Sequence, residues 1–464
     1  MSSLREASDD LETAIRLVEP RVSYVEALAQ EVSGSEFRFD KAQAAATAEP
    51  HIRGAVFRAW SGSDWREATS TGLTRAGLHR AARELLDSLP GNGGSTPPPG
   101  ESATGAAEAI TPQAKPIGEV GYEELLARAR EMHGWAMAVT GLTNANVGIS
   151  LQADERLFVS SAGCRRYQKV TYVRSGIFAL AQEGGRVELD YASEGGTGGA
   201  EILDRMDESR AQSAAREALA LLKAPAAPSG KLAVILDPSA AGTFAHESFG
   251  HGTEADQILR NRSYLKPLLG TRLAPENLTL YDDGSMPGGW GSMFFDDEGQ
   301  PARRTVLVDR GMFVGLLHDR ESAAALGHPP TGNTRRSDYL SRPYVRMTNT
   351  CVAPGDLTLE ELAEEAGTGV LMENFWSGLE DPLGGQMQIT VRKGHRVENG
   401  RIAGLVRGMT LSGRVLDFLQ SVRGLSRSSD FEMSVGSCGK GHGDPVPTGT
   451  GGPYLLSEAV VGPM

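Results

Sequence analysis

The sequence predicts an α+β protein with more than one domain, and three features lead to this fold class. The chain has 464 residues, which is too long for one ordinary domain. Short alternating or wholly apolar runs, separated by many of the 57 Gly and 24 Pro residues, predict strands joined by turns. Fewer segments carry apolar residues at helical spacing. The C-terminal half is the richest in strands, so we expect a large mixed or antiparallel β-sheet domain there.

Residues 1–90 are expected to form a smaller α/β domain. Its expected elements are a helix with the apolar stripe Leu11, Ala14 and Leu17, strands at 24–29, 36–39 and 54–60, and a helix capped by Thr74 that reaches Leu86. Residues 91–117 consist mainly of Gly, Pro, Ser, Thr and Ala, and this composition predicts a linker.

A middle α+β domain is expected over residues 118–223, and a C-terminal domain over 231–464. The expected elements of the middle domain are a helix at 122–139, strands at 146–153, 157–160, 166–174 and 177–183, and a helix at 211–222. The segment APAAPSG at 224–230 separates the two domains as a second linker.

Composition excludes several classes of function. The net charge is −13, and such an acidic chain is poorly suited to neutralising nucleic-acid phosphates, so no nucleic-acid partner is expected. No apolar run approaches the roughly 18 residues that a membrane span needs, and the charged N-terminal segment does not look like a secretion signal. Three scattered Cys residues do not form a disulfide framework, so we expect a cytoplasmic protein with reduced thiols.

The motif that carries chemistry follows the apolar run Lys231–Leu236, which predicts a buried strand. Asp237 and Pro238 then have the residue types of a helix cap and a first helical position. Next comes His246-Glu-Ser-Phe-Gly-His251, an H-E-x-x-x-H pattern. Two imidazoles beside a Glu suggest a metallopeptidase, in which the ion acidifies a bound water and Glu247 takes the proton.

The spacing of this motif predicts an irregular helix. Residues five apart lie about 140° apart around a regular α-helix, so His246 and His251 would not face one ion. The helix must accommodate an extra residue or loosen between them. Gly250 and Gly252 make such a distortion easier, and π-bulges are frequent at functional sites.

The wider context of the motif resembles the TldD/PmbA peptidase family. The matching segments, in family order, are FAHESFGHGTEAD at 244–256, DDG at 282–284, DDEG at 296–299, PTGNTRR at 330–336, RMTNT at 346–350, CGK at 438–440 and VPTGTG at 446–451. Together these segments span the C-terminal half, and the N-terminal region fits the family more loosely.

The resemblance implies an α+β fold, a two-subunit assembly that encloses the active site in a chamber, and one Zn²⁺ per chain. His246, His251 and Cys438 correspond to the family's zinc ligands, and Glu247 to its base. Because TldD-type subunits carry the metal and TldE/PmbA-type partners lack it, this chain resembles the catalytic subunit. The expected partner is a metal-free TldE/PmbA-type paralogue in a heterodimer, or a second copy in a homodimer.

Residue types leave some roles open. Two His form a weak zinc site, and Asp or Glu in the 254–256 turn is the rival to Cys438 as third ligand. Glu254 and Asp256 are alternatively acceptors that orient a ligand His, or surface carboxylates. Lys440 is expected to help keep Cys438 as a thiolate.

Further residues are weaker candidates for substrate binding. Arg335 and Arg336 have the chemistry to clamp a carboxylate, although a structural role is favoured for the pair. His318, His395 and His442 are candidate donors to the oxyanion of the transition state.

Two segments depart from the family pattern, at 390–400, which is short and basic, and at 441–444. They lend some support to a second hypothesis, in which the substrate is the amide of a natural-product biosynthetic intermediate. The leading hypothesis remains a peptide substrate held at a sheet edge. A third hypothesis is a non-catalytic modulator or binding subunit, in keeping with the family's older description as modulators of DNA gyrase. The intact ligand set and Glu247 argue against it.

Overall fold

The computed structural model describes residues 4–41, 43–48, 51–90, 97–441 and 444–464, and these form the expected α+β fold. The α-helices are α1 (Ser8–Val18), α2 (Arg75–Ser88), α3 (Tyr122–Met137), α4 (Glu208–Leu221), α5 (Pro238–Thr243), α6 (Ala255–Leu259), α7 (Arg320–Leu326), α8 (Leu359–Ala366) and α9 (Val415–Gln420). The strands of the N-terminal half are β1 (Val25–Phe39), β2 (Ala44–Ala48), β3 (Ile52–Trp60), β4 (Trp65–Ser70), β5 (Gly105–Ile110), β6 (Asn144–Ser160), β7 (Cys164–Glu183) and β8 (Arg186–Thr197).

The strands of the C-terminal half are shorter on average. They are β9 (Gly230–Leu236), β10 (Leu280–Asp283), β11 (Arg304–Asp309), β12 (Met312–Phe313), β13 (Thr334–Arg335), β14 (Tyr344–Val345), β15 (Asn349–Val352), β16 (Gly369–Asp381), β17 (Gln386–Glu398), β18 (Arg401–Arg414), β19 (Gly424–Leu425), β20 (Glu432–Lys440), β21 (Asp444–Gly452) and β22 (Leu455–Pro463).

One long, curved sheet takes strands from both sides of the expected linker. Its order is β4-β3-β1-β6-β7-β5, with β2 added beside β1 and β8 beside β7. Because β1 pairs with β6 from Glu26↔Ser160 to Phe39↔Val147, the expected domains 1–90 and 118–223 share a sheet. Several pairs of short expected strands are single long ones. Polar residues between the expected short strands pair across the sheet, as Gln30 does with Asp154 at 3.1 Å.

The segment expected to be a linker also contributes to this sheet. Residues 105–110 form β5, which pairs in parallel with the first residues of β7. Small side chains do not prevent an extended segment from hydrogen-bonding to an open strand edge, because the backbone supplies the donors and acceptors. Residues 91–96 of the expected linker lie outside the described part of the chain.

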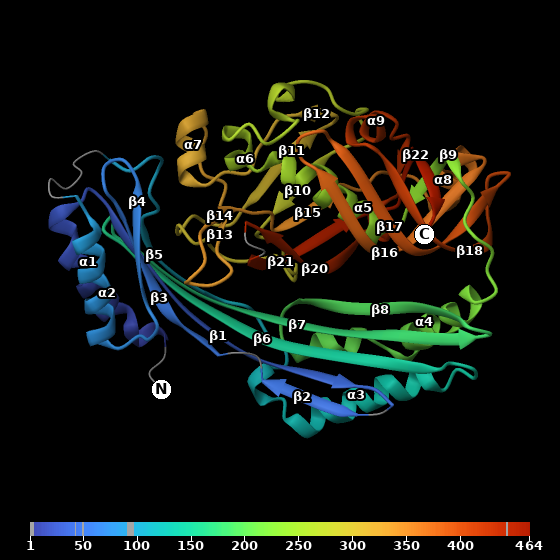
Figure 1. Ribbon diagram of the computed structural model, residues 1–464, viewed down its shortest axis with the longest axis horizontal. Helices are drawn as coiled ribbons and strands as arrows, with labels where there is room; N and C mark the ends of the chain where they lie inside the picture. Colours follow the sequence, from blue (N-terminus) through green and yellow to red (C-terminus); the bar gives the residue numbers. More distant parts are fainter. Residues whose placement is uncertain (1–3, 42, 49–50, 91–96, 442–443) are drawn as a thin grey trace.

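Helices cover one face of the N-terminal sheet, and the C-terminal half lies against the other (Figure 1). Helices α1 and α2 pack at one end and α3 and α4 at the other, each pair over its own apolar cluster. On the opposite face Leu28, Val56 and Phe158 pack against Phe295 and Tyr339 of the C-terminal half. The curved sheet therefore presents its uncovered face toward the C-terminal domain.

Buried ion pairs also join the two halves. Arg156 of β6 lies 2.6 Å from Asp297, and Arg58 of β3 lies 3.0 Å from Glu298. All four side chains are at most 14% exposed. Charges this buried need their partners, so these pairs fix the position of the C-terminal domain over the sheet.

The C-terminal domain contains two large sheets around one core. Strands β18-β17-β16-β9-β22 close on themselves, because β18 also pairs with β22, and β19 extends this sheet beyond β22. The second sheet has the order β12-β11-β10-β15-β21-β20, which leaves β20 at an edge. Apolar residues of both sheets and of α5 share a single cluster. The segment that follows α5, residues 244–253, lies beside the edge strand β20, and the candidate site is formed between them.

Candidate metal centre

The local sequence explains how the metal motif begins. Strand β9 ends at Leu236, and the side chain of Asp237 then accepts a hydrogen bond from the backbone N–H of Ala240 at 2.8 Å. Pro238 occupies the first helical position, where it loses no hydrogen bond. The predicted cap thus starts α5, which points the following residues into the core.

The helix carrying the two His residues is irregular, as their spacing predicts. Residues Phe244–Gly250 form a π-helix, followed by a short 3-10 turn at His251–Thr253. The backbone N–H of His251 donates to the carbonyl of His246, five residues earlier. This wider turn accommodates one more residue than an α-helical turn, so the two imidazoles reach the same side.

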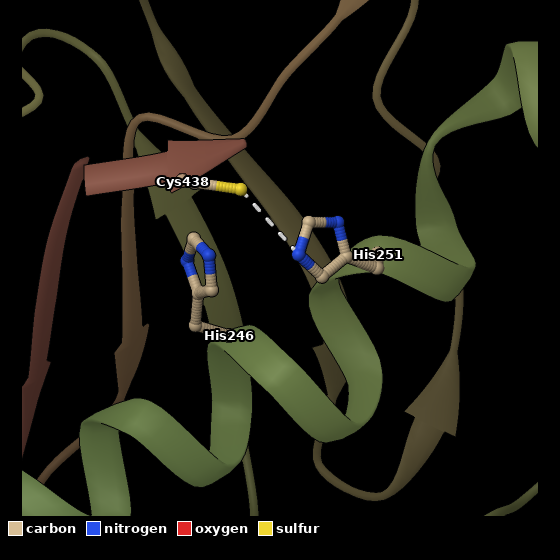
Figure 2. Close-up of side chains that lie close together, drawn as sticks. All are labelled: His246, His251 and Cys438. Atoms are coloured by element: carbon tan, nitrogen blue, oxygen red, sulfur yellow. Dashed lines mark hydrogen bonds between the residues drawn. The ribbon is translucent and has the colours of Figure 1, made fainter. Parts of the chain in front are cut away.

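Cys438 of β20 completes a three-residue cluster with these imidazoles (Figure 2). One ligand atom from each of His246, His251 and Cys438 lies within 4.8 Å of the other two, and the Sγ of Cys438 is 3.4 Å from Nε2 of His251. Among the described residues, these three side chains are the one group of His, Cys, Asp or Glu placed closely enough to hold a single metal ion. Two imidazoles and a thiol are the ligand types of catalytic zinc, so the donor set fits this metal.

The surroundings of Cys438 favour its thiolate, which is the form that binds a metal ion. Burial alone would raise its pKa, but hydrogen bonds from His246 and His251 lower the pKa to about 4. Contrary to the expectation from the sequence, Lys440 is not the group that favours the thiolate of Cys438. Its ammonium binds Glu254 at 2.8 Å and Asp256 at 2.9 Å, so the two imidazoles favour the thiolate instead.

Two buried acceptors contact the far side of the imidazoles. Nδ1 of His251 lies 3.6 Å from Glu254, a side chain only 1% exposed. Burial would raise the pKa of Glu254, but Lys440 and His251 lower it to about 2. Nδ1 of His246 lies 3.5 Å from the hydroxyl of Thr350, which donates to Asp282. Contacts of this kind orient metal-binding His rings. In the turn at 254–256, Glu254 has the position for that role, whereas Asp256 binds Lys440.

Residue types alone did not single out Thr350 or Asp282. The signal was present, however, because both lie in segments that resemble the family, RMTNT and DDG. Asp282 also accepts from Asn333 at 2.9 Å and from Thr348 at 2.6 Å, so the PTGN segment joins the same network. These separate motifs form one buried support beneath His246.

Glu247 stands beside the cluster and is accessible. Its carboxylate lies 3.9 Å from Nε2 of His251, and its side chain is 29% exposed. The backbone of β16 passes directly over it, since a Cβ at Gly378 would lie 2.9 Å from the Cγ of Glu247. Gly378 therefore leaves room for this side chain, and β16 limits the positions that the carboxylate can take.

Two clefts meet at Glu247. The His246 cleft, of about 410 Å³, lies between β8, β16 and β20 and contains His246 and Glu247. The His251 cleft, of about 500 Å³, contains Glu247, His251 and Glu380. A substrate can thus extend away from the metal ligands in two directions.

The residues suggested for substrate binding are not brought to these clefts. Arg335 is 6% exposed and donates to the carbonyls of Met347 and Pro447, and Arg336 is 3% exposed and binds Glu67 and the carbonyl of Ser341. Their guanidinium groups therefore support the interior rather than clamp a substrate carboxylate. Sequence motifs name a residue type but not its burial, which decides between the two roles.

The candidate His residues also lie elsewhere. His318 is 2% exposed and its ring stacks on His328, where burial lowers its pKa to about 4. His395 binds Glu373, and this hydrogen bond raises the pKa of its imidazole. His442 lies outside the described residues. Neither His318 nor His395 lines the clefts at Glu247.

Comparison with known proteins assigns the chain to a family. A family model described as the PmbA/TldA metallopeptidase central domain matches residues 115–222, and one described as the C-terminal domain matches residues 229–462. A protein of Methanothermobacter thermautotrophicus named "Metalloprotease" is 36% identical over 365 residues, which cover 78% of this chain and 79% of the relative. The chain belongs to the PmbA/TldA metallopeptidase family.

Other members of this family carry more specific names. A Saccharolobus solfataricus protein named "Zinc metalloprotease TldD homolog" is 35% identical over 235 residues, 50% of this chain and 52% of that protein. The crystal structure of TldE from Thermococcus kodakarensis has a TM-score of 0.78 at 19% identity, covering 97% of this chain and 99% of TldE, which establishes a common fold. Among the described residues, none of the helices combines the length and apolar character of a membrane crossing.

Proposed function

We propose that this chain is a zinc-dependent peptidase of the TldD type, with His246, His251 and Cys438 as ligands. The observation that supports it is the convergence of these three donor atoms within 4.8 Å beside an accessible Glu247. Zinc in such a site polarises a carbonyl and lowers the pKa of a bound water. Glu247 would accept a proton from the attacking water and pass it to the leaving amine.

The two strands beside the site would hold the substrate. Within the described residues, β16 pairs after Met372 with β17 alone, and β20 pairs with β21 alone. Edge strands offer unpaired backbone donors and acceptors, to which an extended peptide can add as a further strand. The amide bond to be hydrolysed would then cross the cluster near Glu247, with its two ends in the two clefts.

The alternative substrate, a natural-product amide, lacks a comparable observation. It rests on the segments at 390–400 and 441–444. Residues 442–443 lie outside the described part of the chain, and the charges of 390–400 have partners within it. Lys393 lies 2.9 Å from Asp190, and His395 binds Glu373. These pairs fasten β17 to β8 and β16. Lys393 also lines the His246 cleft, but its ion pair gives no reason to prefer a different amide over a peptide.

The test of the function separates metal binding from catalysis. The chain and its Glu247→Gln variant are purified, their zinc content is measured, and hydrolysis of an unstructured peptide is followed by mass spectrometry. We expect close to one zinc per chain in both proteins and a rate about 10²–10⁴-fold lower in the variant, because only the base is lost. A non-catalytic modulator subunit would hold no zinc. A variant that keeps a tenth of the activity or more would overturn the role of Glu247.

We further propose that the chain acts as one subunit of a dimer, most simply with a metal-free TldE-type paralogue and otherwise with a second copy. The common fold with TldE supports the first arrangement, since two chains of one shape can enclose a site between them. Co-purification from the native host, followed by mass spectrometry of the partner, distinguishes the two. An active monomer of 49.3 kDa would exclude both.

A further inference from the structure

A row of residues without large side chains crosses the uncovered face of the N-terminal sheet. Gly148 of β6 lies directly opposite Gly176 of β7, and Gly176 lies opposite Ser193 of β8. On the other side Gly148 is opposite Arg38 of β1. The row borders a hollow of about 640 Å³, which we call the sheet groove. This volume is within the range of ligand sites.

The backbone does not require glycine at the floor of the groove. Neither Gly148 nor Gly176 has a positive φ. A Cβ at Gly148 would meet no atom within 4 Å, and one at Gly176 would make only ordinary contacts, the nearest at 3.5 Å. Glycine weakens a strand relative to residues with side chains, and in strand interiors it often marks the close approach of a ligand or another backbone. The effect of glycine at these two positions is therefore to keep the floor of the groove free of side chains.

Aromatic rings form one wall of the groove, and a guanidinium group lies on the other side. Phe178 and Tyr191 are cross-strand partners with ring centroids 5.6 Å apart. Phe178 is 45% exposed, although it is large and apolar. Arg174 also borders the groove, four residues before Phe178 on β7 and so about 13 Å away along the strand. Aromatic rings and guanidinium groups both stack on aromatic rings, and this spacing admits one ring between them.

The sheet groove borders the His246 cleft. Tyr191, Ser193 and Val435 line both hollows, so the two are immediate neighbours. Val435 lies on β20, three residues before Cys438, which is about 10 Å along an extended strand. If a substrate peptide lies along β20 with its scissile bond at the metal ligands, the substrate residue about three positions away would lie at the groove.

We propose that the sheet groove binds an aromatic side chain of the substrate, located about three residues from the scissile amide. The ring would lie on Gly148 and Gly176, with Phe178 and Tyr191 on one side and Arg174 on the other. The identity of the occupant rests on the proposed peptidase function, whereas the aromatic preference follows from the groove itself. The chain would accordingly select peptides by a residue distant from the bond that it cleaves.

The test measures binding, so it does not depend on hydrolysis. The zinc-loaded Glu247→Gln protein is titrated calorimetrically with three hexapeptides of Ala and Ser. One has a single Phe at the first position, one has it at the last position, and one has none. We expect one of the two Phe peptides to bind about 2- to 12-fold more tightly than the Phe-free peptide. Equal affinities, or no measurable binding of any of the three, would overturn the proposal.

Variants locate the preference. Gly148→Leu fills the floor where a side chain meets no neighbour, and it is expected to abolish the preference while zinc content and Tm stay unchanged. Gly404→Leu, on β18, is the matched control because a Cβ there also meets no atom within 4 Å. It should keep the preference. Phe178→Ala removes an exposed wall residue and should reduce the preference even if Gly148→Leu folds poorly. A preference that survives both groove variants would refute the assignment.

Failure of this proposal and failure of the peptidase function are distinguishable. Hydrolysis of the Phe-free hexapeptide by the unmodified chain, with any partner that co-purifies, reports on catalysis alone. A selective groove without hydrolysis would leave a peptide-binding protein. Hydrolysis without selectivity would leave a peptidase that lacks this specificity site.

Discussion

Replacing Lys440 by Met is expected to destabilise the metal domain strongly. The ammonium of Lys440 lies 2.8 Å from Glu254, 2.9 Å from Asp256 and 2.8 Å from the carbonyl of Val345. At an effective dielectric constant of about 20, each ion pair is worth about 6 kcal/mol of attraction, which the desolvation of the three buried charges largely offsets. Removing Lys440 takes the nearest cation away from two buried carboxylates, with His251 left beside Glu254, and that costs about 3–5 kcal/mol.

The loss should depend on pH with a definite sign. The pKa of Glu254 is lowered from 4.5 to about 2 in the folded chain. Such a depressed carboxyl stabilises the fold above its unfolded pKa by about 3 kcal/mol, and the contribution disappears as pH falls through the folded pKa. Without Lys440, burial raises the pKa of Glu254 above its wild-type value, while His251 still lowers it. The difference between wild type and Lys440→Met should therefore be largest at neutral pH and shrink as pH falls from about 4.5 toward 2.

Urea unfolding followed by tryptophan fluorescence, with EDTA present so that bound metal does not contribute, measures both effects. Lys231→Met is the control, because Lys231 pairs with Glu458 at 3.1 Å but is 72% exposed. It should lose less than about 1 kcal/mol at any pH. A loss below about 1 kcal/mol for Lys440→Met at pH 7, or a loss that grows as pH falls, would refute the reasoning.

Three further predictions concern the metal centre and the assembly. Cys438→Ser should lose most of its zinc, whereas Cys164→Ser and Cys351→Ser should not, and X-ray absorption of the unmodified chain should show one sulfur at about 2.3 Å. A nitrogen- and oxygen-only shell would contradict this ligand. Gly250→Ala should cost about 1–3 kcal/mol and reduce zinc affinity, because its Cβ would lie 2.0 Å from Sδ of the buried Met347. In the double variant with Met347→Ala the clash is relieved, so its loss in thermal unfolding should be smaller than the sum of the two single losses, and zinc affinity should be partly recovered. Light scattering of the active protein should give the mass of a dimer.

Sequence reasoning was strongest where a spacing had a geometric consequence. The five-residue separation of His246 and His251 is incompatible with one face of an α-helix, and the structure contains a π-helix there. The Asp237 cap and the start of α5 followed from local chemistry in the same way. Such features depend on neighbours in the chain, so a single sequence contains the information that determines them.

Sequence reasoning was weakest where the deciding partner is distant in the chain. Lys440 follows Cys438 closely in the sequence, but its partners come from the turn at 254–256. Arg336 resembles a substrate clamp until Glu67, from the N-terminal sheet, is seen beside it. The expected strands were too short for the same reason. The polar residues within β6 interrupt the apolar pattern, and only their cross-strand partners in β1 show that the strand continues.

The shared N-terminal sheet has a consequence for how the protein is made. Glu26 pairs with Ser160, so β1 has to wait for a strand that emerges from the ribosome 134 residues later. At about 5–20 residues per second this delay is about 7–27 s. Throughout it, the edge of β1 that will receive β6 has no native neighbour and can template pairing with another nascent chain. Synthesis of this protein thus includes a period of aggregation risk that chaperones must cover, and a fragment ending near residue 117 would remain in that state permanently.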